Sequence, residues 1–312
     1  MQAGSLRYDR LPRERHFRML TFNKRGLTAR ILKNAAVVCL GAIVFAFMFE
    51  AFELSQVYHP TRESESGVTA VSPDGEDLFL TASDGVKLHA WFIPGRGIEH
   101  RRNTVFLFSH GNGGNLTSRP DYYSAILQTG AALLAYDYRG YGKSEGEPGE
   151  AGTYLDVFAA YDWLIERGFA PERIIAWGES LGGGIASKVA AERKLGGLVL
   201  QSSFTSMPDI GSEYFPFLPV HTLGKIKYDT HSRLPEIHCP VVVMHSENDD
   251  IIPYRHGRKN FERANEPKAF VKLEGGHNDS IVANVAKYVE GAETIVKLIE
   301  AQVDLKGNTV TK

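Results

Sequence analysis

GESLG occupies residues 178–182 of the chain, after the apolar run IIAW at residues 174–177 and before a helix-like run of small residues. A serine with a glycine two positions before it and another two positions after it, between a strand and a helix, is typical of a nucleophile elbow. The serine takes a strained conformation on this sharp turn, and a Cβ at either glycine would collide with the neighbouring strand and helix. At a helix N-terminus, backbone N–H groups favour a developing oxyanion. The stretch therefore predicts that Ser180 is a nucleophile, and the structural alternative is a tight turn capped by serine.

A glycine-rich loop follows an apolar run in the stretch TVFLFSHGNGGN, residues 104–115. In hydrolases with a nucleophile elbow, such a loop supplies one main-chain donor of the oxyanion hole, and the residue after the serine supplies the other. We expect these donors to be the N–H groups of Asn112 and Leu181, with Gly113 as the rival to Asn112. A phosphate-binding loop is disfavoured because no GKS or GKT follows and the spacing does not fit GxGxxG.

Two further apolar runs end in residues that could complete a catalytic triad. VVVMHSENDDIIP, residues 241–253, breaks into an acidic turn, and FVKLEGGHND, residues 270–279, ends in two glycines and a histidine. Histidine titrates near neutral pH and can take a serine proton and return it, so we expect His277 to be the base. A carboxylate at the end of a strand can orient the imidazole; we expect Asp249 in this role, with Asp250 as the alternative. No HExxH or cysteine–histidine cluster indicates a metal site, and this chemistry needs no cofactor.

The order serine, acid, histidine is the order found in the α/β-hydrolase superfamily, which the chain resembles over residues 76–301. The resemblance includes SDGVKL at residues 83–88, WFIP at 91–94 and DYRGYGKSEG at 137–146. The last stretch is similar to a loop of the membrane-anchored hydrolase-domain subgroup, whose members include protein depalmitoylases and lysophospholipid or acylglycerol lipases. The resemblance implies the α/β-hydrolase fold and a serine hydrolase. We expect Asp137 and Arg139 to brace their loop rather than to act chemically.

Strand-like and helix-like runs alternate through residues 77–304, which indicates an α/β domain with a mostly parallel, eight-stranded sheet covered by helices on both faces. A small cap is expected between residues 203 and 240, with an apolar patch at 214–220 that could line an acyl-binding groove, enter a bilayer or only hold the loop. The expected strands are 77–83, 86–93, 104–109, 132–136, 173–177, 197–202, 241–245 and 269–273. The expected helices are 120–128, 154–167, 181–193, 254–264 and 281–301.

The charge of the chain is unevenly distributed. The 312 residues carry a net charge of −2, which argues against a nucleic-acid partner, yet residues 1–34 are strongly basic. An apolar stretch follows, and we expect residues 35–53 to form a single transmembrane helix, with a cleavable signal peptide or a core helix as alternatives. The basic flank predicts a cytoplasmic N-terminus and a catalytic domain on the periplasmic or lumenal side. Residues 54–76 are expected to be a linker and residues 305–312 a tail.

Together these features predict a membrane-anchored serine hydrolase of carboxylic or thio-esters, with an acyl lipid or acyl thioester as substrate. Ser180 attacks the acyl carbonyl, His277 takes the proton, and Asp249 fixes the imidazole. The alternatives are a serine peptidase that uses the same triad and a non-catalytic scaffold with this fold.

Overall fold

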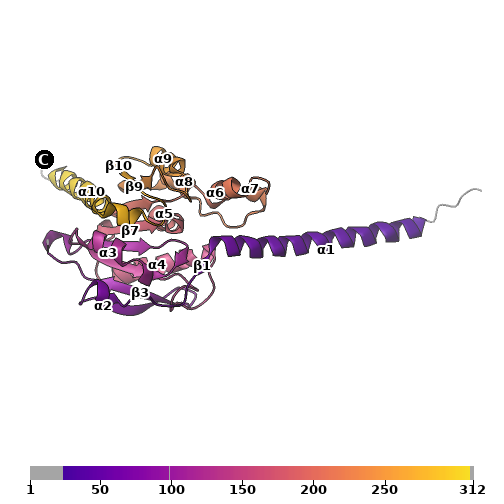
Figure 1. Ribbon diagram of the computed structural model, residues 1–312, viewed down its shortest axis with the longest axis horizontal. Helices are drawn as coiled ribbons and strands as arrows, with labels where there is room; N and C mark the ends of the chain where they lie inside the picture. Colours follow the sequence, from indigo (N-terminus) through magenta and orange to yellow (C-terminus); the bar gives the residue numbers. More distant parts are fainter. Residues whose placement is uncertain (1–23, 98, 310–312) are drawn as a thin grey trace, which may run out of the picture. The chain divides into compact units, whose positions relative to one another are not determined.

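The computed structural model describes residues 24–97 and 99–309 (Figure 1). The chain divides into two units between Met48 and Phe49. Most of the predicted basic segment, residues 1–23, and the end of the predicted tail, residues 310–312, lie outside the described residues.

The second unit is built around the predicted eight-stranded sheet, whose strand order is β10-β9-β8-β7-β4-β6-β3-β2. Neighbouring strands are parallel except at β2–β3 and β3–β6, which are antiparallel. The strands are β2 (Glu76–Thr81), β3 (Lys87–Ile93), β4 (Val105–Ser109), β6 (Ala132–Tyr136), β7 (Ile174–Glu179), β8 (Gly197–Gln201), β9 (Val241–Ser246) and β10 (Lys268–Leu273). These bounds agree with the predicted ones to within two residues, because interior strands that are buried on both faces have continuous apolar sequences.

Helices cover both faces of the sheet and enclose two apolar cores (Figure 1). On one face α4 (Glu150–Glu166) and α5 (Leu181–Glu192) pack against the sheet through residues such as Leu164 and Ile185. On the other face α3 (Pro120–Leu127) and α10 (Ser280–Thr309) pack through Tyr123 and Ala292. The α/β-hydrolase fold that the sequence predicts is therefore confirmed.

The parallel strands determine where the functional loops lie. The carboxyl ends of parallel strands lie at one edge of a sheet, and ligands bind at this edge in open α/β sheets. The loops after β4, β7, β9 and β10 contain Asn112, Ser180, Asp249 and His277. The topology thus brings segments from four parts of the sequence to one side of the second unit.

A small cap, residues 203–240, follows β8, as expected. It contains three short helices, α6 (Met207–Tyr214), α7 (Val220–Leu223) and α8 (Thr230–Arg233), and a 3-10 turn at Leu234–Glu236. The helix α9 (Tyr254–Arg263) follows β9.

The helix α1 (Lys24–Val57) is longer than the predicted span at residues 35–53. Its segment Leu32–Val57 is long and apolar enough to cross a membrane by length and composition. The segment predicted as a linker, residues 54–76, belongs to the second unit: its first residues end α1 and the next ones pair with the glycine-rich loop. Strand β1 (His59–Pro60) pairs in parallel with β5 (Gly113–Gly114), and α2 (Val68–Val71) follows. This pairing uses main-chain groups of the glycine-rich loop, so it does not require apolar side chains in residues 54–76.

Candidate functional site

The loop between β7 and α5 has the geometry of a nucleophile elbow. Ser180 has φ of 52°, in the left-handed region that non-glycine residues rarely adopt, and its N–H donates to the Gln201 carbonyl at 2.9 Å. A Cβ at Gly182 would overlap the main-chain carbonyl of Ser109, and one at Gly178 would overlap the backbone of Gly182. Both glycines are therefore sterically required, for the reason predicted from the sequence.

Ser180, His277 and Asp249 are joined by hydrogen bonds. His277 Nε2 lies 3.1 Å from Ser180 Oγ, and His277 Nδ1 lies 2.8 Å from Asp249 Oδ2 and 3.0 Å from Oδ1. Because the carboxylate accepts a hydrogen bond from the Nδ1–H group, the neutral imidazole presents the lone pair of Nε2 to the serine hydroxyl. All three side chains are largely buried. The arrangement can move a proton from the hydroxyl to the imidazole.

The structure distinguishes between the two adjacent aspartates. Asp249 Oδ1 accepts the N–H groups of Ile251 at 3.0 Å and Ile252 at 2.7 Å, so the carboxylate is fixed beside the imidazole. Asp250 instead accepts the main-chain N–H of His277 at 2.9 Å. Burial alone would raise the pKa of Asp249, but hydrogen bonds from His245 and His277 and from the backbone hold this pKa well below its usual range.

His245 is a neighbour of Asp249 that we did not predict from the sequence. Its ring is buried, and Nε2 lies 2.8 Å from the Ile252 carbonyl and 3.4 Å from Asp249 Oδ2. It supports the turn that holds the carboxylate. His245 lies four residues before Asp249, and because this spacing is not typical of any motif at the end of a strand, the sequence did not indicate the contact.

The two expected oxyanion donors lie in the segments that follow β7 and β4. Leu181 begins α5, where the first N–H groups have no partner within the helix. The Asn112 carbonyl accepts from His59 N at 3.0 Å and Tyr141 Oη at 2.8 Å. Within residues 24–97 and 99–309, no protein acceptor is paired with the main-chain N–H of Leu181 or Asn112. Both groups are therefore available to a ligand.

A buried ion pair joins the elbow to the glycine-rich loop. Glu179 Oε2 lies 3.1 Å from Arg119 Nε and accepts the Gly111 N–H at 3.1 Å. Burial alone would raise the pKa of Glu179, but the charge and hydrogen bonds of Arg119 lower it below its usual range. We did not predict this pair. A signal was present in the sequence, since a charged residue between Gly178 and Ser180 in a buried turn requires a partner.

The other polar residues around the loop have structural roles. Asp137 Oδ1 accepts the Leu116 N–H at 2.6 Å, and the Arg139 guanidinium lies 2.7 Å from both Asp84 and Asp156. Asp137 and Arg139 thus brace their loop, as expected from the sequence. Among the described residues, no group of three or more His, Cys, Asp or Glu side chains is arranged to hold a metal ion.

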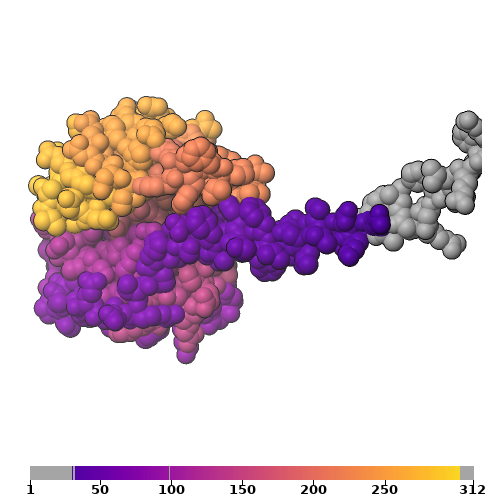
Figure 2. All heavy atoms as spheres, turned by 45° about the vertical axis from the view of Figure 1, so that its right-hand side comes forward, coloured from indigo at the N-terminus to yellow at the C-terminus, as the bar shows by residue number. Residues whose placement is uncertain are grey.

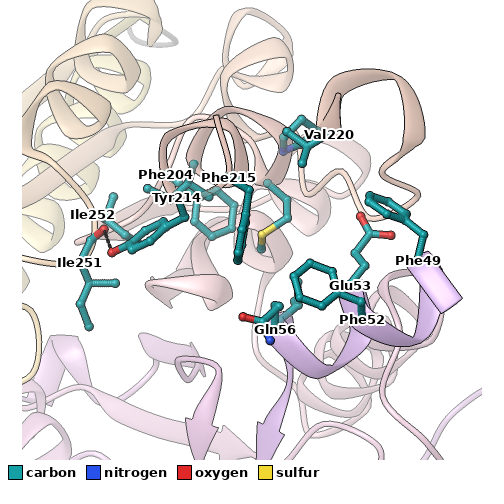
Figure 3. Close-up of a pocket in the computed structure, with 15 residues that line it drawn as sticks. Phe49, Phe52, Glu53, Gln56, Phe204, Tyr214, Phe215, Val220, Ile251 and Ile252 are labelled. Atoms are coloured by element: carbon teal, nitrogen blue, oxygen red, sulfur yellow. Dashed lines mark hydrogen bonds between the residues drawn. The ribbon is translucent and has the colours of Figure 1, made fainter. Parts of the chain in front are cut away.

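An apolar pocket of about 360 Å³ lies beside these loops (Figure 3). It is lined by the end of α1, by the cap and by the turn that follows Asp249; the residues include Phe49, Phe52, Gln56, Val57, Phe204, Tyr214, Phe215, Val220, Ile251 and Ile252. Part of the apolar patch predicted at residues 214–220 therefore lines a pocket, whereas Phe217 in the same patch is 97% exposed. The N–H groups of Ile251 and Ile252 hold Asp249, so the pocket and the triad share a turn.

Comparisons with known proteins agree with the fold. A family model described as the alpha/beta hydrolase fold matches residues 104–221. Alpha/beta hydrolase domain-containing protein WAV2 of Arabidopsis thaliana is 30% identical over 77% of this chain and 86% of its own length. Lysophosphatidylserine lipase ABHD12 of Danio rerio is 30% identical over 53% of this chain and 48% of its own. Among solved structures, the Pyrococcus furiosus esterase Pf2001 matches with a TM-score of 0.64 at 20% identity, over 77% of this chain and 98% of that one.

Proposed function

The chain belongs to the α/β-hydrolase family, and we propose that it is a serine hydrolase of carboxylic or thio-esters. The observation that carries the proposal is the hydrogen-bonded series Ser180, His277, Asp249 on a nucleophile elbow. Family membership supports a hydrolase, and the series specifies which side chains would perform the reaction. No cofactor has a step in this chemistry.

The reaction has two halves. In the first, Ser180 Oγ attacks the acyl carbonyl while its proton passes to His277 Nε2, and His277 then gives that proton to the departing alcohol or thiol. In the second, a water molecule gives a proton to His277 and attacks the acyl-enzyme, and the same proton returns to Ser180 as the carboxylic acid leaves. Asp249 stays ionised throughout, holds the imidazole tautomer and stabilises the imidazolium.

The oxyanion of each tetrahedral intermediate needs two donors. We assign them to the main-chain N–H groups of Leu181 and Asn112; the assignment is supported by the lack of a protein acceptor for either group among the described residues. Donors of this kind act on charge that develops in the transition state, and removal of one costs on the order of a hundredfold to a thousandfold in kcat.

The substrate class is proposed to be an ester or thioester of an acyl chain. An apolar pocket shares a turn with the triad, and one relative is a lysophosphatidylserine lipase. We further propose that α1 anchors the protein in a membrane, with a cytoplasmic N-terminus and the second unit on the periplasmic or lumenal side. Protease added to intact spheroplasts reaches only the outer face of the membrane and should remove the C-terminus. A C-terminus protected from the protease would show the opposite orientation.

The proposal is tested by turnover of the purified, full-length protein. We expect hydrolysis of p-nitrophenyl butyrate that Ser180→Ala abolishes, while Ser232→Ala, at an exposed serine, retains it. Alanyl anilides should not be turned over. Anilide hydrolysis that exceeds ester hydrolysis would indicate a peptidase, and no turnover of either substrate by the folded protein would indicate a binding scaffold.

A further inference from the structure

We propose that the last turns of α1 are part of the active site, where they form a wall of the pocket that binds the acyl chain of the substrate. This inference rests on the proposed function and extends it, because it assigns a substrate-binding role to the helix that also contains the candidate membrane span. The occupant is the medium or long acyl chain of an ester or thioester bound at Ser180.

The wall is one face of the helix. Phe49, Phe52, Glu53 and Gln56 line the pocket, and their spacing of three and four residues places them on the same side of α1 (Figure 3). The opposite wall belongs to the cap. The rings of Phe52 and Phe215 meet edge to face, with centroids 5.3 Å apart at 76°. The two segments therefore enclose the space between them with apolar surface.

Polar bonds fix this wall to the cap. The Glu53 carboxylate accepts the main-chain N–H of Lys225 at 2.9 Å and that of Ile226 at 3.2 Å, and Glu50 pairs with the Lys225 ammonium at 2.7 Å. Figure 2 shows the orange cap against the indigo C-terminal part of α1. The acidic group in the pocket wall is thus already engaged by the backbone of the cap, and apart from Glu53, Gln56 and the Tyr214 hydroxyl the side chains that line the pocket are apolar.

Two residues that line the pocket, Val57 and Ile252, are hydrogen-bonded to residues of the proposed reaction centre. The Val57 carbonyl accepts a hydrogen bond from the Asn112 amide at 3.1 Å, beside a proposed oxyanion donor. The pocket residue Ile252 donates its N–H to Asp249. A chain attached to an acyl carbon at Ser180 can thus extend into this space.

The chemistry of the lining selects an acyl chain over a polar ligand. Tyr214 Oη donates to the Ile251 carbonyl at 2.8 Å, and Glu53 is engaged as above, so a polar ligand would lose its hydration with few partners in return. The volume of about 360 Å³ falls within the range of small-molecule pockets, about 300–1,000 Å³. A flexible apolar chain fits such a space.

Changes at Phe52 in the full-length protein test the proposal. Phe52→Trp fills the pocket and should lower the decanoate-to-acetate ratio of kcat/KM for p-nitrophenyl esters about tenfold or more, while Phe52→Ala should move the preference toward longer chains. Phe79→Trp and Phe79→Ala are matched controls, because Phe79 is exposed on β2 and does not line the pocket; the ratio should not change. An unchanged ratio in both Phe52 variants would overturn the proposal.

A binding measurement separates this inference from the proposed function. In the Ser180→Ala background, a fluorescent dodecanoic acid should bind with a Kd that Phe52→Trp raises at least severalfold and Phe79→Trp leaves unchanged. Binding that responds in this way without any ester turnover by the parent protein would refute the hydrolase and retain the acyl site. Ester turnover by the parent protein, together with a Kd that Phe52→Trp does not change, would retain the hydrolase and refute the acyl site.

Discussion

The side-chain amide of Asn112 donates a hydrogen bond to the main-chain carbonyl of Val57, 3.1 Å away. Val57 is the last residue of α1, and Asn112 lies in the loop that carries a proposed oxyanion donor. The end of a helix that is apolar enough to cross a membrane is therefore bonded directly to the loop on which the proposed chemistry depends.

We expect Asn112→Ala to lower kcat with little change in KM. The substitution retains the main-chain N–H but removes the bond to Val57, so the donor loses part of its positioning; misplacement of about 1 Å can cost on the order of a hundredfold in rate. Steady-state kinetics with a short-chain ester would measure the effect. An unchanged kcat would show that the loop is positioned without the Val57 bond.

Asp249→Asn should lower kcat by roughly four orders of magnitude, as loss of the carboxylate does in other serine triads, because the imidazole loses its fixed tautomer. Asp250→Asn is the matched neighbour, and we expect a change below tenfold, since its oxygen only accepts the main-chain N–H of His277. Equal effects of the two substitutions on ester turnover would contradict the assigned roles.

Separation of Arg119 from Glu179 should destabilise the protein. Their side chains are only 10% and 13% exposed, so Glu179→Gln leaves a buried guanidinium without its counter-charge and should cost about 3–5 kcal/mol of unfolding free energy. Addition of Arg119→Met should recover part of this loss. The exposed pair Lys188–Glu192 is the control, and Lys188→Met should cost about 0.5 kcal/mol or less. Urea denaturation of the parent and the three variants measures these costs, and a cost for Glu179→Gln no larger than that of Lys188→Met would refute the prediction.

Stability should fall in mildly acidic solution, in part through His256. Its Nε2 lies 3.0 Å from Glu213 Oε1 in the cap helix α6, and its Nδ1 accepts the Thr205 N–H at 3.2 Å. Burial lowers the pKa of His256, although Glu213 partly opposes this. The imidazole therefore binds a proton more readily in the unfolded chain than in the folded protein. The contribution of the neutral His256 ring to the free energy of unfolding is consequently lost as pH falls below about 6.5. His256→Gln should lose less stability than the parent between about pH 7.5 and about pH 5.5; an equal loss would exclude His256 as a source.

The sheet and the central residues of the site could be predicted because each has a local signal. The run at residues 241–244 is apolar throughout, as in a strand covered on both faces. The pattern around Ser180 reflects a steric demand for glycine that the structure confirms at Gly178 and Gly182. The triad residues follow such strands, so their meeting at one edge follows from the topology.

The contacts of the end of α1 could not be predicted in the same way. Strand β1 has only two residues and pairs through main-chain groups, which no side-chain pattern records. Glu53 resembles an ordinary acidic flank of an apolar helix, yet its carboxylate caps main-chain N–H groups far along the chain, at Lys225 and Ile226. In the cap, tertiary packing places Phe215 in the pocket and Phe217 in solvent, although both belong to one apolar run.

The most direct test of the proposed chemistry is labelling of the purified protein with a fluorophosphonate, followed by mass spectrometry of its peptides. We predict one adduct on Ser180, none in folded Ser180→Ala, and unchanged labelling in Ser232→Ala. Folded parent protein that takes up no label, or label that persists elsewhere in Ser180→Ala, would contradict a nucleophilic role for Ser180.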